Sequence, residues 1–419
     1  MYGNPGVRSW HIQHFGALNV FGYKDFIPMF KADKFVPDKW ATMFRDAGAR
    51  YVALTAEHHD GFSLWDSKIN KRNAMYMGPH RDLIGDLAKA VRSKGMVFGV
   101  TNHSMENFTF LQPENLPENP RETTDLYNPE WADYYHVADR SVEARTSFYR
   151  DWVLKNMELI DKYHPSMLWF DNGVNSRTLD PIKLYVAAYY YNRSKEWKQQ
   201  VTLSTKGEAY LAGSVLDHER QGRAEQEIYP VPWQVDESVH SRWGYLTETN
   251  YLKVYDIVWR LVENVSRNGN LLLNFSPMPD GTFNQVQIDL LKGIGEWMRQ
   301  NGEGIYDSKP WIKYGEGPSS ERAQRRNQPP YVPEDFRFTR KGNILYVFVM
   351  SWPENGVATV RSLAAGSKGF TGRISRITMP GANGKLKFSQ DSEGLHVTLP
   401  QQKPGQHIWE LKIEGLKLE

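Results

Sequence analysis

The sequence predicts an α/β protein, a (β/α)8-like (TIM-type) barrel followed by a C-terminal antiparallel β-sandwich. As far as about residue 310, buried strand-like runs alternate with amphipathic helices over short connections, which is typical of a parallel sheet. Beyond about residue 334, short alternating strands are separated by turns, which indicates an antiparallel sandwich. A length of 419 residues suits two domains. We expect a barrel domain at 1–312, a linker at 313–334 and a sandwich at 335–419.

The barrel elements follow from hydrophobic periodicity and from cap residues. One helix is expected to begin after Asp82, whose carboxylate can cap it, and to end at Gly95. Another is expected to begin at Pro181, because proline is favoured in a first helical turn. Further helices are expected at 146–163, 251–266 and 284–300, and strands at 51–55, 97–100, 166–171, 201–205 and 271–275. The polar stretch 104–145 is too long for an ordinary loop and is read as an insertion with room for short helices.

Composition excludes several classes of protein. A net charge of +2 without any Lys/Arg run argues against nucleic acid as a partner. No apolar run approaches the ~18 residues of a membrane span. The absence of cysteine excludes disulfides, cysteine–zinc sites and cysteine nucleophiles. The first ten residues, MYGNPGVRSW, lack the apolar region of a signal peptide, so such a peptide is either absent or already removed.

Ionisable residues gather where three expected strands end. They are Glu57-His58-His59-Asp60, Asp171-Asn172-Gly173 and Asp217-His218-Glu219-Arg220. The carboxyl ends of parallel strands open on one crevice, so these residues are candidates for a site. The alternatives remain open: a hydrogen-bonded strand end for the first group, a capping Asp for the second and a solvated loop for the third.

Two carboxylates in an aromatic-rich barrel suggest glycoside hydrolysis, in which one carboxylate attacks or stabilises the anomeric carbon and the other moves the proton. A metal site is the competing use of His14 and residues 57–60. However, HHD is not HExxH, and neighbouring strand residues point to opposite faces, so we expect no metal. Without GxSxG, a P-loop or GxGxxG before a helix, we expect no other cofactor either.

The stretch YVALTAEHHDGFSLWDS (51–67) resembles the most distinctive motif of the family 29 glycoside hydrolases, the retaining α-L-fucosidases. WHIQHFG (10–16) is similar to that family's N-terminal strand, and LWFDNG to the strand that bears its nucleophile. NVSRNGNLLLNFSPMPDGT and GEWMRQNGEGIYDSKPW resemble its last barrel strand and helix, and FTRKGNILYVFVMSWPENG its C-terminal sandwich. The resemblance spans nearly the whole chain.

The resemblance implies a role for each matching residue. It implies Asp171 as the nucleophile and Glu219 as the acid/base, with Glu208, Glu225 and Glu227 as competitors for the second role. The residues that it implies in sugar binding are His14, His58, His59, Asn102, His103, Trp169, Lys206 and Trp243. The implied substrate is a fucosylated oligosaccharide or glycoconjugate. The implied location is secreted or periplasmic, with a cytoplasmic location and the oligomeric state left open.

Several positions depart from the family pattern. Lys206 stands where an arginine is usual, Asn102-His103 replaces tyrosines, and Gln234 replaces a glutamate. The family's Glu-Trp is not evident in FGYKDF. An α-L-galactosidase and a fucose-binding barrel without catalysis therefore remain as alternatives. A metal-dependent sugar isomerase or lyase on the same type of barrel is a further one.

Overall fold

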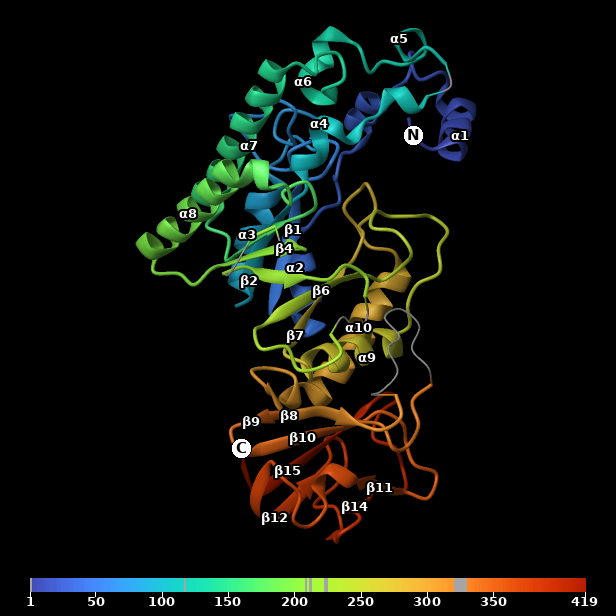
Figure 1. The fold of residues 1–419 in the computed structure, drawn as a ribbon. Coiled ribbons are helices and arrows are strands. Elements are labelled where there is room, and N and C mark those ends of the chain that lie inside the picture. Colours follow the sequence, from blue (N-terminus) through green and yellow to red (C-terminus); the bar gives the residue numbers. More distant parts are fainter. Residues whose placement is uncertain (1, 117, 208, 211–212, 222–224, 320–329) are drawn as a thin grey trace. The chain divides into compact units, whose positions relative to one another are not determined.

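A computed structural model gives the fold of residues 2–419, apart from 117, 208, 211–212, 222–224 and 320–329 (Figure 1). The chain divides into two compact units. The first comprises Met1–Arg45, Ala49–Val215 and Pro277–Phe283. The second comprises Asp46–Gly48, Leu216–Ser276 and Asn284–Glu419.

Parallel strands alternating with helices build the first unit. Strands β1 (Tyr51–Glu57), β2 (Val97–Asn102), β3 (Met167–Phe170) and β4 (Thr202–Lys206) pair in chain order, each parallel to the next. The helices between and before them are α2 (Pro37–Asp46), α3 (Leu83–Ser93), α7 (Val142–Tyr163) and α8 (Asp180–Trp197). Asp82 caps α3 by accepting a hydrogen bond from the Gly85 amide at 2.9 Å, as the sequence predicts.

The N-terminal segment corrects one expectation. Residues 10–16 are not a strand, because helix α1 spans Pro5–Phe15. Asn4 caps this helix by accepting from the Val7 amide at 3.0 Å, and Pro5 occupies its first turn, so local chemistry favours the helix. The buried His11 lies against the rings of Phe15, Phe21 and Phe26.

The insertion contains the short helices for which the sequence has room. They are η2 (Ser104–Glu106), α4 (Asn107–Phe110), η3 (Pro113–Asn115), α5 (Pro120–Thr123), η4 (Pro129–Trp131) and α6 (Ala132–Tyr135). Elsewhere in this unit lie η1 (Tyr23–Met29) and η5 (Arg177–Leu179). Phe108 of α4 is buried and packs against Phe148 of α7, with ring centroids 5.3 Å apart. The insertion is therefore anchored on the barrel-type part of its own unit.

The second unit contains the remaining parallel strands. Strand β6 (Trp233–Ser238) pairs in parallel with β5 (Val215–Asp217) and with β7 (Gly269–Asn274), and helices α9 (Val254–Val265) and α10 (Gln285–Asn301) follow. Strand order β1 to β7 is that of the chain, and the described residues contain seven parallel strands, not eight. Strand β6 escaped the sequence analysis because Gln, Asp and Glu interrupt its apolar pattern, although all six residues are buried.

Two antiparallel sheets complete the second unit, as predicted. One has the order β12-β15-β10-β9-β8 and the other β11-β14-β13. Their bounds are β8 (Lys309–Glu316), β9 (Phe336–Lys341), β10 (Ile344–Val349), β11 (Val357–Val360), β12 (Phe370–Thr378), β13 (Phe388–Gln390), β14 (Leu395–Thr398) and β15 (Trp409–Leu418); η6 (Gly302–Gly304) and η7 (Arg361–Leu363) are short helical turns. Alternate side chains of both sheets fill one core, which defines a sandwich. Strand β8 begins before, and reaches into, the expected linker.

Helices α9 and α10 share a second hydrophobic core with the five-stranded sheet. Figure 1 shows the ribbons of both helices beside that sheet. Trp259 and Trp297 of these helices belong to the same buried cluster as Tyr346 and Phe348 of β10. The α/β class, with parallel strands followed by an antiparallel sandwich, is thus confirmed.

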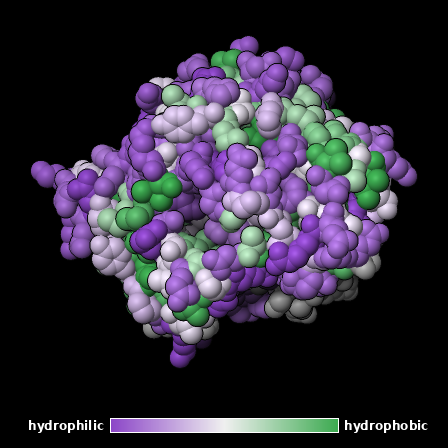
Figure 2. Space-filling model, turned by 90° about the horizontal axis from the view of Figure 1, so that it is seen from above, coloured by the Kyte–Doolittle hydropathy of each residue, from purple (hydrophilic) through white to green (hydrophobic). Residues whose placement is uncertain are grey.

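The face of the molecule drawn in Figure 2 is largely polar. Figure 2 shows hydrophilic side chains over most of the visible face, with apolar side chains in small separate groups. Among the described residues, no helix combines the length and the apolar character that crossing a bilayer requires.

Candidate active site

Four neighbouring strands of the first unit end in polar side chains. His58 and His59 follow β1, His103 follows β2, and Asp171 follows β3. Lys206 is the last residue of β4. Because parallel strands end at the same edge of their sheet, residues far apart in the sequence meet there.

Asp171 is the centre of this group. Its side chain is 6% exposed, and its Oδ2 accepts a hydrogen bond from His103 Nδ1 at 2.7 Å and lies 3.4 Å from His59 Nε2. Oδ1 lies 2.7 Å from Lys206 Nζ and accepts from the Asn172 amide at 2.7 Å. Burial by itself raises the pKa of Asp171. The hydrogen bonds from His103 and His59 and the positive charge of Lys206 outweigh it and hold that pKa far below the ordinary value.

The three histidines differ in charge. Burial lowers the pKa of His103 although Asp171 opposes the shift, so its ring is neutral at pH 7 and donates from Nδ1. Burial also opposes protonation of His59, yet its bond to Asp171 and the charges of Asp171 and Glu106 leave its pKa raised. The surrounding protein and the rings of His103 and His59 lower the pKa of His58 to about 3, although part of that residue is open to solvent. The site therefore holds Asp171 ionised beside one imidazole whose pKa is raised and two whose pKa values are lowered.

Trp169 packs against the cluster, and Asn102 forms hydrogen bonds next to it. Trp169 is 2% exposed, its ring centroid lies 5.0 Å from that of His103, and Lys206 Nζ lies 5.3 Å above it. The Asn102 side chain donates to Asn156 at 3.0 Å and accepts from the Ser104 amide and hydroxyl. Asn102 thus holds the start of the insertion, and its contact with a sugar stays a prediction.

The four ionisable residues Glu57–Asp60 have different partners in the structure. Glu57 is fully buried and pairs with Lys155 of α7 and with the Ser63 hydroxyl. Asp60 accepts from the Tyr23 hydroxyl at 3.1 Å, and burial raises its pKa to about 6. Only His58 and His59 of the four lie beside Asp171. Lys155 was not found from sequence because nothing local marks it as the partner of Glu57.

His14 lies on helix α1, where its side chain is exposed. Its Nδ1 bonds the Trp10 carbonyl at 2.7 Å, and its ring stacks on that of Trp10 with centroids 4.2 Å apart. The role of His14 in sugar binding was predicted on the assumption that residues 10–16 form a strand, whereas His14 lies in a helix. That role stays a prediction.

A metal ion is the competing occupant of this site. One nitrogen from each of His58, His59 and His103 lies within 4.8 Å of the others, the one such group among the described residues. His59 and His103 already direct nitrogens at Asp171. This geometry fits an anion-holding cluster better than a metal centre.

Glu219 and Trp243 belong to the second unit. Trp243 Nε1 donates to Glu219 Oε1 at 3.1 Å, and the Arg220 guanidinium lies 4.4 Å from the Trp243 ring. The Arg220 amide donates to the Asp236 carbonyl of β6 at 2.9 Å, which fixes the loop that carries Glu219. The two residues that the resemblance implied are therefore brought together within this unit.

The competing carboxylates lie in different settings. Glu225 is 3.0 Å from His218 Nε2, and Glu227 is exposed. Glu208 lies outside the described residues. Asp217 is buried, accepts from the Gln234 amide and from the backbone of β6, and so joins β5 to β6.

Glu106 and Phe110 of the insertion also contact the cluster, and the sequence did not predict this. Glu106 Oε2 lies 3.4 Å from His59 Nδ1, and the Phe110 ring stacks on His59 with centroids 4.9 Å apart. Their position a few residues after a strand end was the available signal.

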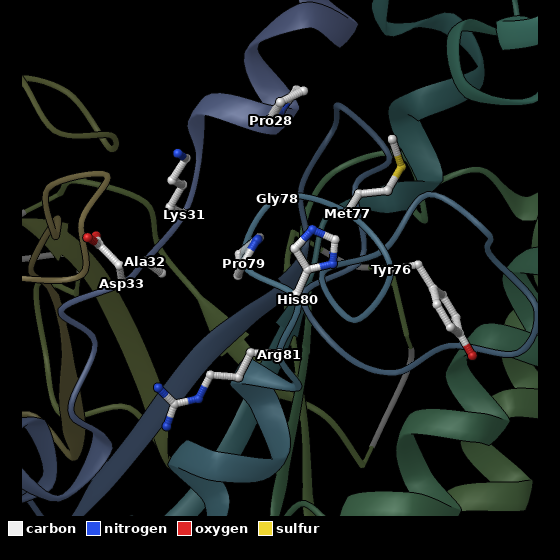
Figure 3. A pocket seen from close by; sticks show the side chains of 10 residues that line it. All are labelled: Pro28, Lys31, Ala32, Asp33, Tyr76, Met77, Gly78, Pro79, His80 and Arg81. Carbon is white, nitrogen blue, oxygen red and sulfur yellow. The ribbon is translucent and has the colours of Figure 1, made fainter.

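A separate cavity of about 680 Å³ lies in the first unit, between residues 28–33 and 76–81 (Figure 3). It shares no lining residue with the Asp171 cluster. The side chains of Lys31, His80 and Arg81 point in different directions in Figure 3. Arg81 pairs with Asp86, which does not line the cavity. Size alone does not make this cavity the site of chemistry.

A buried ionised carboxylate surrounded by imidazole and ammonium donors, at the carboxyl edge of a parallel sheet, defines an enzyme active site of the α/β barrel class. The α-L-fucosidase family model matches residues 1–303, and that of the α-L-fucosidase C-terminal domain matches residues 328–414. The chain belongs to the α-L-fucosidase family of glycoside hydrolases.

Individual relatives agree with this assignment. The tissue α-L-fucosidases of Rattus norvegicus and Homo sapiens are each 30% identical, with 94% and 95% of this chain aligned to 78% of theirs. The Thermotoga maritima α-fucosidase in complex with fucose is 28% identical, with a TM-score of 0.73 over 97% of this chain and 85% of that one. A Thermotoga maritima α-L-fucosynthase in complex with α-L-Fuc-(1-2)-β-L-Fuc-N3 gives 0.75 at 28% identity, over 97% and 83%.

Proposed function

We propose that this protein is an exo-acting, retaining α-L-fucosidase that releases fucose from fucosylated oligosaccharides or glycoconjugates. The observation that carries the proposal is Asp171, which is buried yet held ionised by His103, His59 and Lys206. Such a carboxylate is suited to attack an anomeric carbon as the positive charge of the oxocarbenium-like transition state develops. Family membership and fucose-bound structural relatives support the choice of sugar.

The proposed reaction has two displacements. Asp171 attacks the anomeric carbon while Glu219 protonates the leaving oxygen, which gives a fucosyl ester and the free leaving group. Glu219 then takes a proton from water, which attacks the same carbon and releases fucose and Asp171. Each displacement inverts the anomeric carbon, so their sum retains the α configuration. The hydrogen bond from Trp243 supports Glu219 in this role by fixing one of its oxygens.

Azide distinguishes the two carboxylates by product stereochemistry. In Asp171→Ala, turnover of an aryl α-L-fucoside should fall on the order of 10³-fold or more. Azide can then displace the leaving group directly and give the β-fucosyl azide. In Glu219→Ala the fucosyl ester still forms from a good leaving group, and azide attacks it to give the α-fucosyl azide.

The matched control is Asp151→Ala, which removes a 43% exposed carboxylate from the same unit. Full activity of Asp171→Ala would disprove the nucleophile assignment. If Glu208→Ala, Glu225→Ala or Glu227→Ala gives the α-fucosyl azide and Glu219→Ala does not, the acid/base is that residue. A panel of aryl α-L-fucosides and α-L-galactosides tests the sugar itself.

A further inference from the structure

The segment Ser104–Phe110, which comprises η2 and α4, lies against His59 through three kinds of contact. Asn107 Nδ2 donates to the His59 carbonyl at 2.8 Å, Glu106 Oε2 lies 3.4 Å from Nδ1, and the Phe110 ring stacks on the imidazole. The opposite nitrogen of the same ring, Nε2, lies 3.4 Å from Asp171. Glu106 is therefore one imidazole ring further out than the carboxylate of Asp171.

This segment is held rigidly in place. Asn107 and Phe108 are buried, and Phe108 packs on Phe148 and His136. A Cβ at Gly61 would lie 2.8 Å from the Asn107 amide, and one at Gly173 would lie 2.8 Å from Glu106 Cγ. Both glycines also have positive φ, 80° and 86°. The loop of His59 and the loop of Asp171 can thus approach this segment only because each has a glycine there.

The outer side chains of the segment remain open. Phe110 is 49% exposed although a stacked partner covers part of its ring, and the Glu106 side chain is 34% exposed. The Phe110 ring and the Glu106 carboxylate each contact the imidazole of His59, so two partly exposed groups of different chemistry lie at the edge of the Asp171 cluster. Their chemistry suits a pyranose ring, whose C–H face packs on an aromatic ring while its hydroxyls donate to a carboxylate.

We propose that Phe110 and Glu106 bind the sugar on the leaving-group side of the scissile bond. This proposal rests on the proposed function and extends it, because it names the residues that recognise the second sugar. Asp171 and the histidines around it hold the fucosyl residue, and the next ring of an oligosaccharide lies over Phe110, where Glu106 accepts from its hydroxyls. The segment then selects fucosides by what the fucose is attached to.

Substrates with and without a second ring test the proposal. The wild type and Phe110→Ala are compared on α-L-fucosyl fluoride and on the best-hydrolysed member of a panel of fucosylated di- and trisaccharides. Loss of the stacking ring should lower kcat/KM for the oligosaccharide about 3- to 10-fold. The effect on the fluoride, which has no second ring, should be much smaller. Phe110→Trp should restore the oligosaccharide rate, and Glu106→Gln should raise KM for the oligosaccharide more than for the fluoride.

Tyr185→Ala is the matched control, because it removes a 54% exposed aromatic ring from α8 in the same unit. An equal fall on both substrates would overturn the proposal and make Phe110 a support for His59. No fall on either substrate would also overturn it. Failure of the wild type to hydrolyse any fucoside would instead refute the proposed function, so the two failures are distinguishable.

Discussion

Asp171 stays ionised in a buried site because three donors surround it. Among them, Lys206 supplies an ammonium group, whose Nζ lies 2.7 Å from Oδ1. A lysine at this position offers Asp171 a single ammonium and not the planar fork of a guanidinium.

Lys206→Met is expected to raise the pKa of Asp171, because a carboxylate without its cation is harder to ionise in a buried site. Since the pKa of Asp171 is depressed in the wild type, its ionised form persists well into acid. The variant should lose activity at a higher pH as the solution is acidified, and kcat/KM at pH 7 should fall about 10- to 100-fold.

The pH profile of kcat/KM measures this effect. Lys206→Arg, which keeps the charge, should retain an acid limb close to that of the wild type. Lys162→Met is the control. Lys162 lies on α7 of the same unit, and the substitution breaks its exposed ion pair with Asp66. An unchanged acid limb in Lys206→Met would contradict the expectation.

The sequence predicted only some of the individual residues of the site. His58, His59 and Asp171 could be found because ionisable residues after a buried run mark the open edge of a parallel sheet. The contacts of Glu106 and Lys155 were not predicted, because they depend on how an insertion and a helix pack against that edge. The opposite pKa shifts of His59 and His103 depend on contacts that no local pattern records.

Among the elements, the junction of α6 and α7 contains a titrating group outside the active site. His136 closes α6 in the left-handed conformation, with φ of 50°, and its ring lies against Phe108 and Phe148. Burial, and secondarily the charge of Lys155, lowers the pKa of His136 to about 4. The ordinary value is about 6.5, so the unfolded chain binds a proton that the folded protein excludes between these two pH values.

The contribution of His136 to stability is therefore complete above about pH 6.5 and is lost as the pH falls toward 4. His136→Asn keeps a residue that tolerates the left-handed conformation and removes the titration. Between pH 7 and pH 4.5 the wild type should lose roughly 2 kcal/mol more unfolding free energy than the variant.

Denaturant unfolding at the two pH values measures the difference. Lys198→Asn is the control, because Lys198 is also left-handed, with φ of 54°, and exposed, and lysine titrates far above this range. Equal pH dependence in the wild type and His136→Asn would refute the assignment.

Elements with strong local signals were predicted, and elements that depend on distant packing were not. Asp82 and Gly95 bound a helix, and Pro181 starts another, as their own chemistry dictates. Strand β6 is buried on both sides although it carries Asp236 and Glu237, and Arg260 of α9 supplies a partner for Glu237. Helix α1 is the opposite case. Residues 10–16 resembled a strand of the family, but the local signals of Asn4 and Pro5 favour a helix.

For the whole molecule, the sequence suggested a sandwich joined through a linker, whereas a buried ion-pair network ties helix α9 to that sandwich. Glu263 of α9 is fully buried and pairs with Arg337 of β9 at 2.7 Å and with Arg267. The Tyr331 hydroxyl donates to the same carboxylate at 2.7 Å. Together with the shared core around Trp297 and Phe348, the network makes these parts a single compact unit.

Glu263→Gln should therefore destabilise the whole second unit and not only α9. The substitution leaves two buried guanidinium groups without their carboxylate, which costs about 3–5 kcal/mol. Calorimetry should show α9, α10 and the sandwich unfolding in one transition that moves to lower temperature as a whole. Asp289→Asn, which alters an exposed pair with Lys292, should shift nothing measurable. A transition that splits, with the sandwich melting at its original temperature, would show that the sandwich folds independently of the helices to which Glu263 ties it.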